Sequence, residues 1–151
     1  MLHKILYRLL TIYWRIRKPV VLGVRVLAMR EDEILLVRMT YVKDWYLPGG
    51  GVGAGETARE AAARELFEET GIRAKKLTFK GLYFSERRGL SDHIALFVAD
   101  DFEAVPGARP DREIAEAGFF SISALPKGVS PSTLRRISEA RVDGVPATDA
   151  W

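Results

Sequence analysis

A glycine-rich loop followed at once by an acidic helix is the feature that most restricts how this chain can fold. Glycine occupies five of the seven positions from Gly49 to Gly55, so the backbone there can approach a phosphate chain closely. Every residue from Thr57 to Thr70 is at least a tolerable helix former, and Gly71 can end the helix. The sequence therefore predicts a loop–helix unit with Glu56 at the junction.

Three glutamates, Glu65, Glu68 and Glu69, fall on one side of this predicted helix. Their spacings of three and four residues place the carboxylates on an arc of roughly 100°. Like charges this close destabilise a helix by roughly a few tenths of a kcal/mol for each pair, unless a cation lies between them. Oxygen ligands without a neighbouring histidine or cysteine favour magnesium or manganese. The pattern therefore predicts a divalent-metal site, with Arg64 placed to hold Glu68 or to contact a phosphate.

Alanine and apolar side chains fill the rest of the predicted helix. Leu66 and Phe67 are expected to be buried, whereas Ala61 lies on the acidic side and is expected to leave room for a ligand. An alternative interpretation is a solvent-exposed acidic helix after a flexible loop. That alternative accounts for each of these features when they are taken singly.

Apolar, β-branched runs elsewhere in the chain predict strands. The predicted strands cover residues 20–29, 34–39, 77–85 and 93–101, with short extended or apolar pieces at 45–47 and 118–122. A last helix is predicted over residues 130–140, with Pro131 at its first position. Strands with a helix between them predict α/β layers around one sheet, in a single domain of 151 residues.

The two ends of the chain differ in character from this domain. Residues 1–18 mix apolar, aromatic and basic side chains, and they predict an amphipathic helix that Pro19 ends. The basic residues make this segment a poor transmembrane span, and no small-residue cleavage site follows it. Two interpretations stay open: the helix packs on the domain or on a second copy in a homodimer, or it contacts an anionic membrane surface. The domain is then expected over residues 19–142, with residues 143–151 as a loosely held tail.

The absence of cysteine and the net charge limit both the chemistry and the partners. Without cysteine the chain has no disulfide, no thiol nucleophile and no cysteine-ligated zinc site. The formal net charge of +3 suits a polyanionic partner, such as nucleotide phosphates or an anionic membrane. No lysine/arginine block and no RNA-reading aromatic motif is present, so no nucleic-acid partner is expected. A reducing cytoplasm is the simplest expected location.

Taken together, the loop and the helix resemble the Nudix box. The box has the form G-x5-E-x7-R-E-U-x-E-E-x-G-U, with U an aliphatic residue, and the chain matches it at every specified position. The matching residues are Gly50, Glu56, Arg64, Glu65, Leu66, Glu68, Glu69, Gly71 and Ile72. The preceding Leu47-Pro-Gly-Gly50 and the later segment Glu113–Phe120, followed by Leu125-Pro126, are also similar to sequences of that family. In this later segment Phe119 replaces the usual tryptophan.

The resemblance implies a Nudix-type α/β/α sandwich around a mixed β-sheet, and it implies roles for particular residues. The implied ligands of Mg²⁺ or Mn²⁺ are Glu65, Glu68 and Glu69, helped by the backbone carbonyl of Gly49 or Gly50. Glu69 also belongs to the implied catalytic group, in which Glu56 and Arg64 orient the helix carboxylates. Glu113 is implied to complete the metal site or to act as the general base, with Glu116 as its rival or as a substrate contact.

The substrate is less constrained than the reaction. The proline-rich array of NADH pyrophosphatases is absent, residues 81–92 lack the proline of ADP-ribose pyrophosphatases, and Tyr83 lies too close to the box for the tyrosine of diadenosine polyphosphate hydrolases. Arg87 and Arg88 are candidate substrate contacts, together with the Ser91–His93 turn. A charged surface hairpin is an equally good interpretation of that segment.

These observations favour a pyrophosphatase that acts on a nucleoside diphosphate joined to another group, such as a nucleoside diphosphate sugar or an ADP-ribose-like molecule. One alternative is a nucleoside triphosphate pyrophosphohydrolase that removes abnormal nucleotides. The alternative from another class is a nucleotide-binding or membrane-associated sensor without turnover. The intact box disfavours this last interpretation.

Overall fold

Six strands and two α-helices make up the part of this computed structural model that the structure describes, residues 20–87, 90–140 and 150–151. In chain order the elements are β1 (Val20–Arg30), β2 (Glu33–Met39), β3 (Trp45–Tyr46), α2 (Ala58–Thr70), β4 (Ile72–Arg87), β5 (Leu90–Ala104), β6 (Ile114–Ser121), a 3₁₀ turn (Ile122–Ala124) and α3 (Pro131–Ala140).

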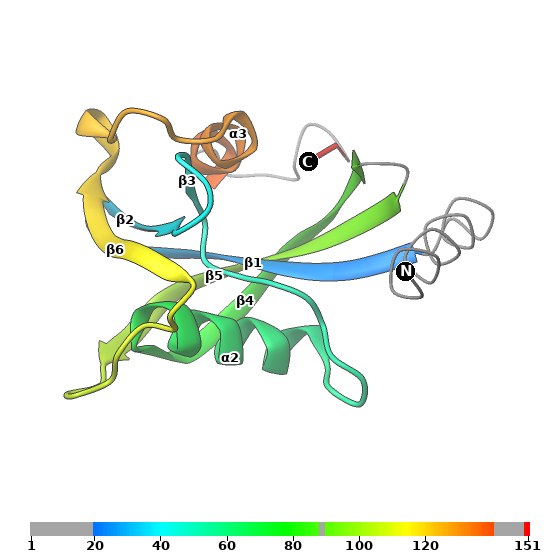
Figure 1. Ribbon diagram of the computed structural model, residues 1–151, viewed down its shortest axis with the longest axis horizontal. Helices are drawn as coiled ribbons and strands as arrows, with labels where there is room; N and C mark the ends of the chain where they lie inside the picture. The colour runs from blue at the N-terminus through cyan, green and yellow to red at the C-terminus, as the bar shows by residue number, and fades with distance from the viewer. Residues whose placement is uncertain (1–19, 88–89, 141–149) are drawn as a thin grey trace, which may run out of the picture.

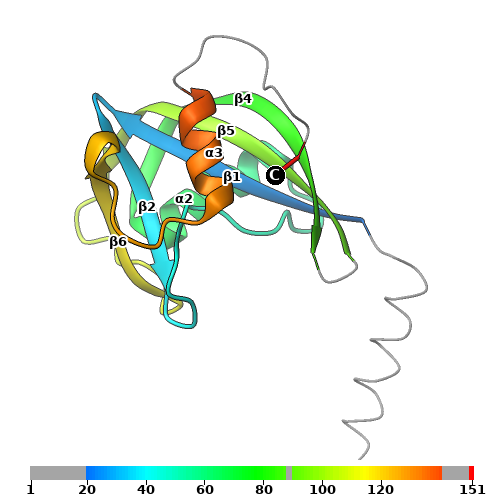
Figure 2. The ribbon, with the colours of Figure 1, turned by 90° about the horizontal axis from the view of Figure 1, so that it is seen from above.

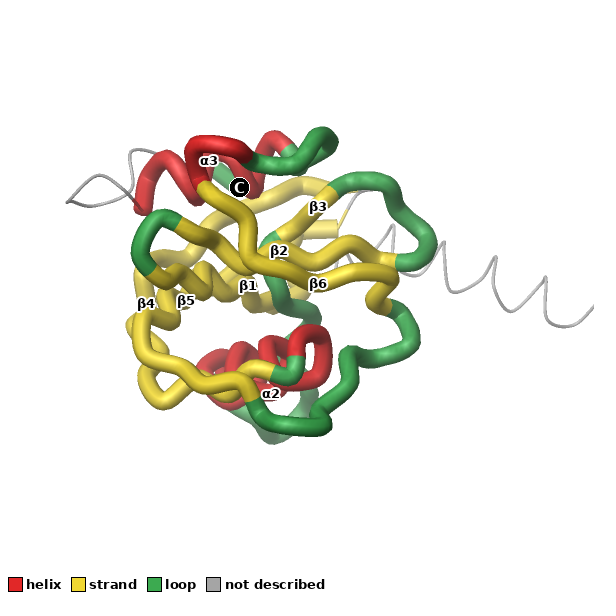
Figure 3. The backbone as a smooth tube through the Cα atoms, turned by 90° about the vertical axis from the view of Figure 1, so that its left-hand side faces the viewer, coloured by secondary structure: helices red, strands yellow, loops and turns green. Residues whose placement is uncertain are grey.

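The strands form a mixed sheet in the order β3-β2-β1-β5-β4, with β6 paired to β2. β1 and β5 are parallel, from Val20 opposite Ser91 to Ala28 opposite Ala99, whereas β4 runs antiparallel to β5. Helix α2 covers one side of the sheet and α3 covers the other (Figures 1 and 3). Figure 2, which looks from the side of α3, shows this helix lying over the strands. The arrangement confirms the predicted α/β/α sandwich around a mixed sheet.

β1 lies between the two helical layers, which explains its composition. Val24 belongs to the core cluster on the α2 side, together with Leu66, whereas Leu27 belongs to the cluster on the α3 side, together with Ile137. A strand that is buried on both faces carries a nearly continuous apolar run. Arg25 is the exception in the middle of this run.

Helix α2 begins and ends at specific capping residues. The Thr57 hydroxyl accepts a hydrogen bond from the Glu60 N–H, and the Glu60 carboxylate accepts one of 2.8 Å from the Thr57 N–H. Such a capping box contributes about 1 kcal/mol to helix stability. At the other end, Gly71 adopts a left-handed conformation (φ 71°) and its N–H donates to the Phe67 carbonyl at 2.8 Å. These caps fix where the acidic residues sit along the helix.

The buried side of α2 differs from the predicted one at two residues. Ala61 was expected to face a ligand, but it is fully buried in the core on the sheet. Phe67 was expected to be buried, but 37% of its surface is exposed. The buried face of α2 includes Glu69 as well as Leu66, so it extends onto the acidic arc.

Three strands are longer than the sequence predicted. β4 and β5 continue through the charged residues 86–92, because Glu86 pairs with Ser91 and Arg87 pairs with Leu90 across a tight hairpin. β6 begins at Ile114, four residues earlier than expected, because it pairs with the whole of β2. Backbone pairing therefore extends strands into polar segments that the apolar pattern does not mark.

The last two residues pack against the domain. The Trp151 N–H donates to the Phe84 carbonyl at 2.8 Å, and the Trp151 ring lies 5.7 Å from that of Tyr83. The guanidinium of Arg136, which is fully buried, lies 4.0 Å from the Tyr83 ring centroid and donates to the Ala150 carbonyl at 2.9 Å. These two residues thus contact the domain, and residues 143–149 of the predicted tail lie outside the described part.

The predicted N-terminal helix over residues 1–18 also lies outside the described residues, and with it the homodimer and membrane-surface interpretations. Within the described residues, neither α-helix has the length and apolar character needed to cross a membrane.

Candidate active site

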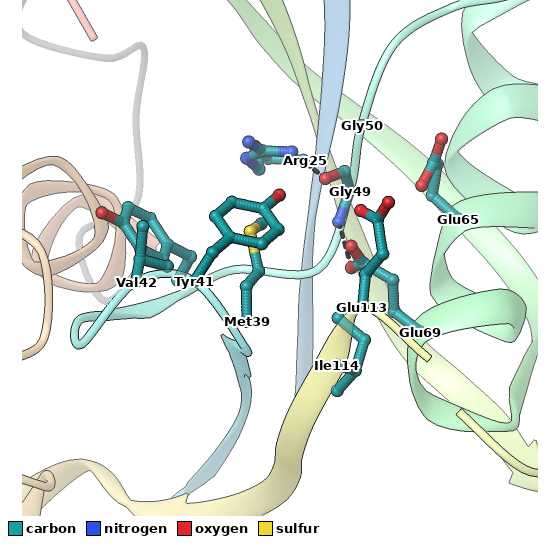
Figure 4. A pocket seen from close by; sticks show the side chains of 11 residues that line it. Arg25, Met39, Tyr41, Val42, Gly49, Gly50, Glu65, Glu69, Glu113 and Ile114 are labelled. Atoms are coloured by element: carbon teal, nitrogen blue, oxygen red, sulfur yellow. Dashed lines mark hydrogen bonds between the residues drawn. The ribbon is translucent and has the colours of Figure 1, made fainter. Parts of the chain in front are cut away.

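A pocket of about 420 Å³ lies where the glycine-rich loop meets α2 and the first residue of β6 (Figure 4). A volume of this order suits a small-molecule ligand. The residues that line it are Arg25, Met39, Tyr41, Val42, Tyr46, Gly49, Gly50, Glu65, Glu69, Glu113 and Ile114. They come from β1, the end of β2 with the turn after it, β3, the loop, α2 and the start of β6.

The glycine-rich loop is held along β1 as if it were a further strand. The Val24 N–H donates to the Gly50 carbonyl at 2.9 Å, and the Val52 N–H donates to the Leu22 carbonyl at 3.0 Å. Gly49 has a φ of 141°, and a Cβ at this position would lie 2.1 Å from the Val24 carbonyl oxygen. Only glycine fits there, and its conformation directs the Gly49 N–H towards α2.

Glu69 is the most buried carboxylate of the site, with 9% of its surface exposed. One carboxylate oxygen accepts a 2.8 Å hydrogen bond from the Gly49 N–H. Burial raises the pKa of Glu69 from its ordinary value of 4.5 to about 7, against the opposing effects of this hydrogen bond and of the Arg25 charge. A carboxylate in such a place is costly to ionise without a further positive partner.

Arg64 ties the acidic side of α2 to the loop. Its guanidinium lies 2.7 Å from Glu56, 2.8 Å from Glu65 and 3.1 Å from Glu68, and it donates to the Gly51 carbonyl at 3.2 Å. Hydrogen bonds to Glu56 and Glu65 raise the pKa of Arg64 above its ordinary value. The pKa of Glu56 is lowered, first by Arg64 and then by a hydrogen bond from the Gly53 N–H. One cation thus lies among three carboxylates.

The predicted ligands do not all face the same pocket. Glu65, Glu69, Gly49 and Gly50 line it. Glu68 instead lies on the exposed side of α2, beside a separate hollow formed with Phe67 and the loop at residues 108–111. Glu56 and Arg64 lie behind the lining residues and hold them in place.

Glu113 and Glu116 are in different surroundings. Glu113 lines the pocket, and its side chain points towards that of Glu69 in Figure 4. Its backbone carbonyl accepts a 2.8 Å hydrogen bond from the Thr40 N–H, which ties it to the turn after β2. Glu116 forms a 2.8 Å ion pair with Arg38 across the β2–β6 ladder and does not line the pocket. The structure therefore brings Glu113, and not Glu116, to the pocket.

The candidate contacts at the β4–β5 hairpin are only partly described. Arg88 lies outside the described residues, and of Arg87 only the backbone pairing with Leu90 is known. The His93 ring lies 5.5 Å from that of Phe84, away from the pocket lining. Asp92 does approach the site, because it lines a second hollow of about 220 Å³ together with Gly23, Arg25 and Gly50. Arg25 and Gly50 border both hollows, so the two adjoin.

Arg25 and Tyr41 were missed by the sequence analysis. Arg25 donates hydrogen bonds to the carbonyls of Gly49 and Val24 and stands beside the pocket (Figure 4). A lone charge in an otherwise apolar central strand was a signal that could have found it. Tyr41, in the turn after β2, had no such signal, because its position depends on the pairing of β2 with β6.

The residue types at the pocket fit a divalent cation. Glu65, Glu69, Glu113 and the loop carbonyls are hard oxygen donors, as magnesium and manganese prefer. The Glu65 carboxylate lies against the loop, so that a Cβ on Gly50 would come within 2.6 Å of it. Across the described ranges, no three acidic, histidine or cysteine side chains lie close enough together to hold a metal ion in their present positions.

Comparisons with known proteins agree with this geometry. The family model described as NUDIX domain matches residues 19–139. The chain is 36% identical over 121 residues to a putative 8-oxo-dGTP diphosphatase of Bacillus subtilis, covering 78% of this chain and 77% of that protein. It is 35% identical over 103 residues to an ADP-ribose pyrophosphatase of Methanocaldococcus jannaschii, covering 65% of this chain and only 60% of that protein. Among solved structures, a MutT NUDIX hydrolase from Burkholderia pseudomallei matches with a TM-score of 0.70 and 25% identity, over 82% of this chain and 98% of that one.

Proposed function

This chain belongs to the NUDIX family of pyrophosphohydrolases, and on that basis we propose that it hydrolyses the pyrophosphate linkage of a nucleoside diphosphate joined to another group. A nucleoside diphosphate sugar or an ADP-ribose-like molecule is the proposed substrate. The products are a nucleoside monophosphate and a phosphorylated second product. Relatives in this family include an ADP-ribose pyrophosphatase, and enzymes of this family generally need a divalent metal ion such as Mg²⁺ or Mn²⁺.

The observation that carries the proposal is that Glu65, Glu69 and Glu113 all line one pocket beside the glycine-rich loop. These side chains come from α2 and from the start of β6, which are more than forty residues apart in the chain. A solvent-exposed acidic helix would have no reason to bury Glu69 against the Gly49 N–H. The same arrangement argues against a sensor without turnover.

The proposed ligands of the divalent ion are Glu65 and Glu69, together with the carbonyl of Gly49 or Gly50. Glu68 would join them on release from Arg64, to which it is bound only at the exposed side of the helix. The chemistry that a bound ion supplies is neutralisation of the pyrophosphate charge and acidification of a water molecule. Mg²⁺ and Mn²⁺ both suit this oxygen donor set.

The remaining side chains are proposed to accept a proton from the attacking water and to hold the helix, the loop and the substrate in position. Glu113 accepts the proton of the attacking water, because it reaches the pocket and, among the described residues, lacks an ion-pair partner of the kind that Glu116 has in Arg38. The ion pair between Arg64 and Glu56 holds α2 and the end of the loop in a fixed relative position. Arg25 places a positive charge beside the pocket, where the phosphates would lie.

The reaction needs no covalent intermediate on the protein. The chain has no cysteine, and the described residues that line the pocket include no serine or histidine. The water oxygen forms a bond to one phosphorus, and the bond from that phosphorus to the bridging oxygen breaks. The bridging oxygen leaves on the other phosphate, and the proton of the water goes to Glu113. Each product therefore carries one phosphate.

A substrate panel with Mg²⁺ tests the proposal. Nucleoside diphosphate sugars, ADP-ribose, dinucleoside polyphosphates and deoxynucleoside triphosphates are compared by kcat/KM, with the products separated by ion-exchange chromatography. We expect a nucleoside diphosphate derivative to be preferred, and heavy-oxygen water to label one phosphate product only. Inorganic phosphate as a primary product, or an isolable phosphorylated protein, would contradict the mechanism.

A second candidate function has support of its own. The similarity to the putative 8-oxo-dGTP diphosphatase spans 78% of this chain, so the enzyme could instead remove abnormal nucleoside triphosphates. That reaction releases pyrophosphate and a nucleoside monophosphate, which the same panel distinguishes. A cytoplasmic location, where either substrate class occurs, is part of both proposals.

A further inference from the structure

The pocket has two unlike walls. One wall is acidic and polar, and consists of Glu65, Glu69 and Glu113 with the loop backbone. The opposite wall is aromatic and apolar, and carries no charge; its members are Met39, Tyr41, Val42 and Tyr46. Arg25 stands between the two (Figure 4). The phosphate chemistry assigned above uses the first wall and leaves the second without a role.

Tyr41 is the outermost group of the aromatic wall. It lies in the turn after β2, and 67% of its surface is exposed although it is a large aromatic side chain. Within the described part of the chain its side chain makes no hydrogen bond, ion pair or ring contact, so most of its surface is available to a ligand. An exposed tyrosine elsewhere on a protein surface would need no explanation. This one borders the pocket that holds the acidic groups.

The turn that carries Tyr41 is fastened to the reaction site. The N–H of Thr40, the residue before it, donates a 2.8 Å hydrogen bond to the carbonyl of Glu113. The same hydrogen bond therefore fixes both the proposed proton acceptor and the backbone next to the tyrosine. A group resting on Tyr41 would be held at a set distance from the bond that breaks.

The charges of the two walls indicate which part of a ligand would contact Tyr41. The acidic wall and Arg25 account for the phosphates and their metal ion, whereas the second wall offers no cation to a further phosphate. A neutral, planar group suits a tyrosine face, because every nucleobase has a π-face that stacks on aromatic rings with little regard to sequence.

Building on the function proposed above, we propose that Tyr41 is the stacking platform for the nucleobase, and that base stacking restricts the enzyme to diphosphates that carry one. Met39 and Val42 complete the apolar surface that contacts the base, while Arg25 and the acidic wall with its metal ion bind the phosphates. The hydroxyl of Tyr41 has no part in this role, because stacking uses the ring face.

Equilibrium binding tests the inference without any turnover. The full chain with Mg²⁺ is titrated calorimetrically with the four nucleoside 5′-monophosphates and with ribose 5-phosphate, which lacks only the base. The variants are Tyr41→Ala, Tyr41→Phe, and Phe84→Ala as a control that removes an exposed ring outside the pocket. We expect at least one monophosphate to bind roughly tenfold more tightly than ribose 5-phosphate.

The variants then separate the ring from the hydroxyl. Tyr41→Ala should lower the affinity for the monophosphate to that for ribose 5-phosphate and leave the affinity for ribose 5-phosphate unchanged. Tyr41→Phe and Phe84→Ala should keep the tighter binding of the monophosphate. The inference is overturned if the wild type binds monophosphates and ribose 5-phosphate equally well. It is also overturned if the tighter binding of the monophosphate persists in Tyr41→Ala or is lost in Tyr41→Phe. The substrate panel tests the proposed function independently, since it depends on cleavage and this experiment does not.

Discussion

The backbone N–H of Gly49 donates a 2.8 Å hydrogen bond to the carboxylate of Glu69, and this contact joins the glycine-rich loop to α2. It requires the positive φ of Gly49 on one side and the burial of Glu69 on the other. The contact therefore depends on the loop conformation and on the position of α2 together. The first three predictions concern this pair.

Replacing Glu69 by glutamine should leave the fold intact and greatly reduce turnover. The amide keeps the size of the side chain and can still accept the Gly49 hydrogen bond, but it removes a negative charge from the proposed metal site. Loss of a group that stabilises charge in an active site costs about 100-fold or more in kcat. Circular dichroism and steady-state kinetics in saturating Mg²⁺ check this. Near-normal kcat in a folded Glu69→Gln protein would remove Glu69 from the site.

Without metal, the stability of the wild-type protein should depend on pH through Glu69. The folded-state pKa of about 7 lies above the ordinary 4.5, so the folded protein holds this proton more tightly than the unfolded chain. The resulting stabilisation is complete below pH 4.5 and is lost as pH rises through 7. We therefore expect the Tm of the wild type in EDTA to fall, relative to that of Glu69→Gln, between about pH 5 and 8. Parallel Tm curves for the two proteins would show that Glu69 is not perturbed.

Alanine at Gly49 should destabilise the domain strongly, whereas alanine at Gly51 should be tolerated. A Cβ on Gly49 would lie 2.1 Å from the Val24 carbonyl oxygen and would occupy a φ of 141°. A Cβ on Gly51 meets nothing within 4 Å. We expect a loss of roughly 3 kcal/mol or more for Gly49→Ala, from strain and overpacking together. Urea unfolding of both variants measures the difference, and equal midpoints would contradict the described loop geometry.

The two glutamates of the β6 segment should behave differently when each is changed to glutamine. Glu113→Gln should lower kcat by about 100-fold or more, because the proposed proton acceptor is lost. Glu116→Gln breaks an exposed ion pair with Arg38, and such pairs contribute only about 0–1 kcal/mol. Its kcat/KM should therefore stay close to that of the wild type. Equal losses in the two variants would show that Glu113 has no special place in the reaction.

The sequence predicted the elements of the fold and the acidic side of the site from local patterns. The helix over residues 58–70 and its glycine cap follow from propensity and capping residues, which act within a few positions of the chain. Glu65 and Glu69 were found because helical spacing alone places them together. The longer extents of β4 and β6 were not predicted, since strand length there depends on pairing with distant segments.

The aromatic wall and Arg25 depend on that same long-range pairing. Tyr41 comes to the pocket only because β2 pairs with β6 and places the turn beside Glu113. Glu113 and Glu116 could not be ranked from sequence for a related reason. The register of β6 on β2 places Glu116 opposite Arg38, its ion-pair partner, and leaves Glu113 at the pocket. No local sequence pattern reveals that register.

The pairing of the glycine-rich loop with β1 also bears on how a substrate arrives. Three backbone hydrogen bonds, at Val24, Val26 and Val52, fasten the loop to the sheet, so the loop cannot swing aside without local unfolding. Their amide protons should exchange with solvent as slowly as those of the central strands. The turn at Tyr41 is the more exposed border of the pocket. On the proposed role of Tyr41, a nucleotide would approach base first over the tyrosine, and its phosphates would reach a loop that is already held in place by the sheet.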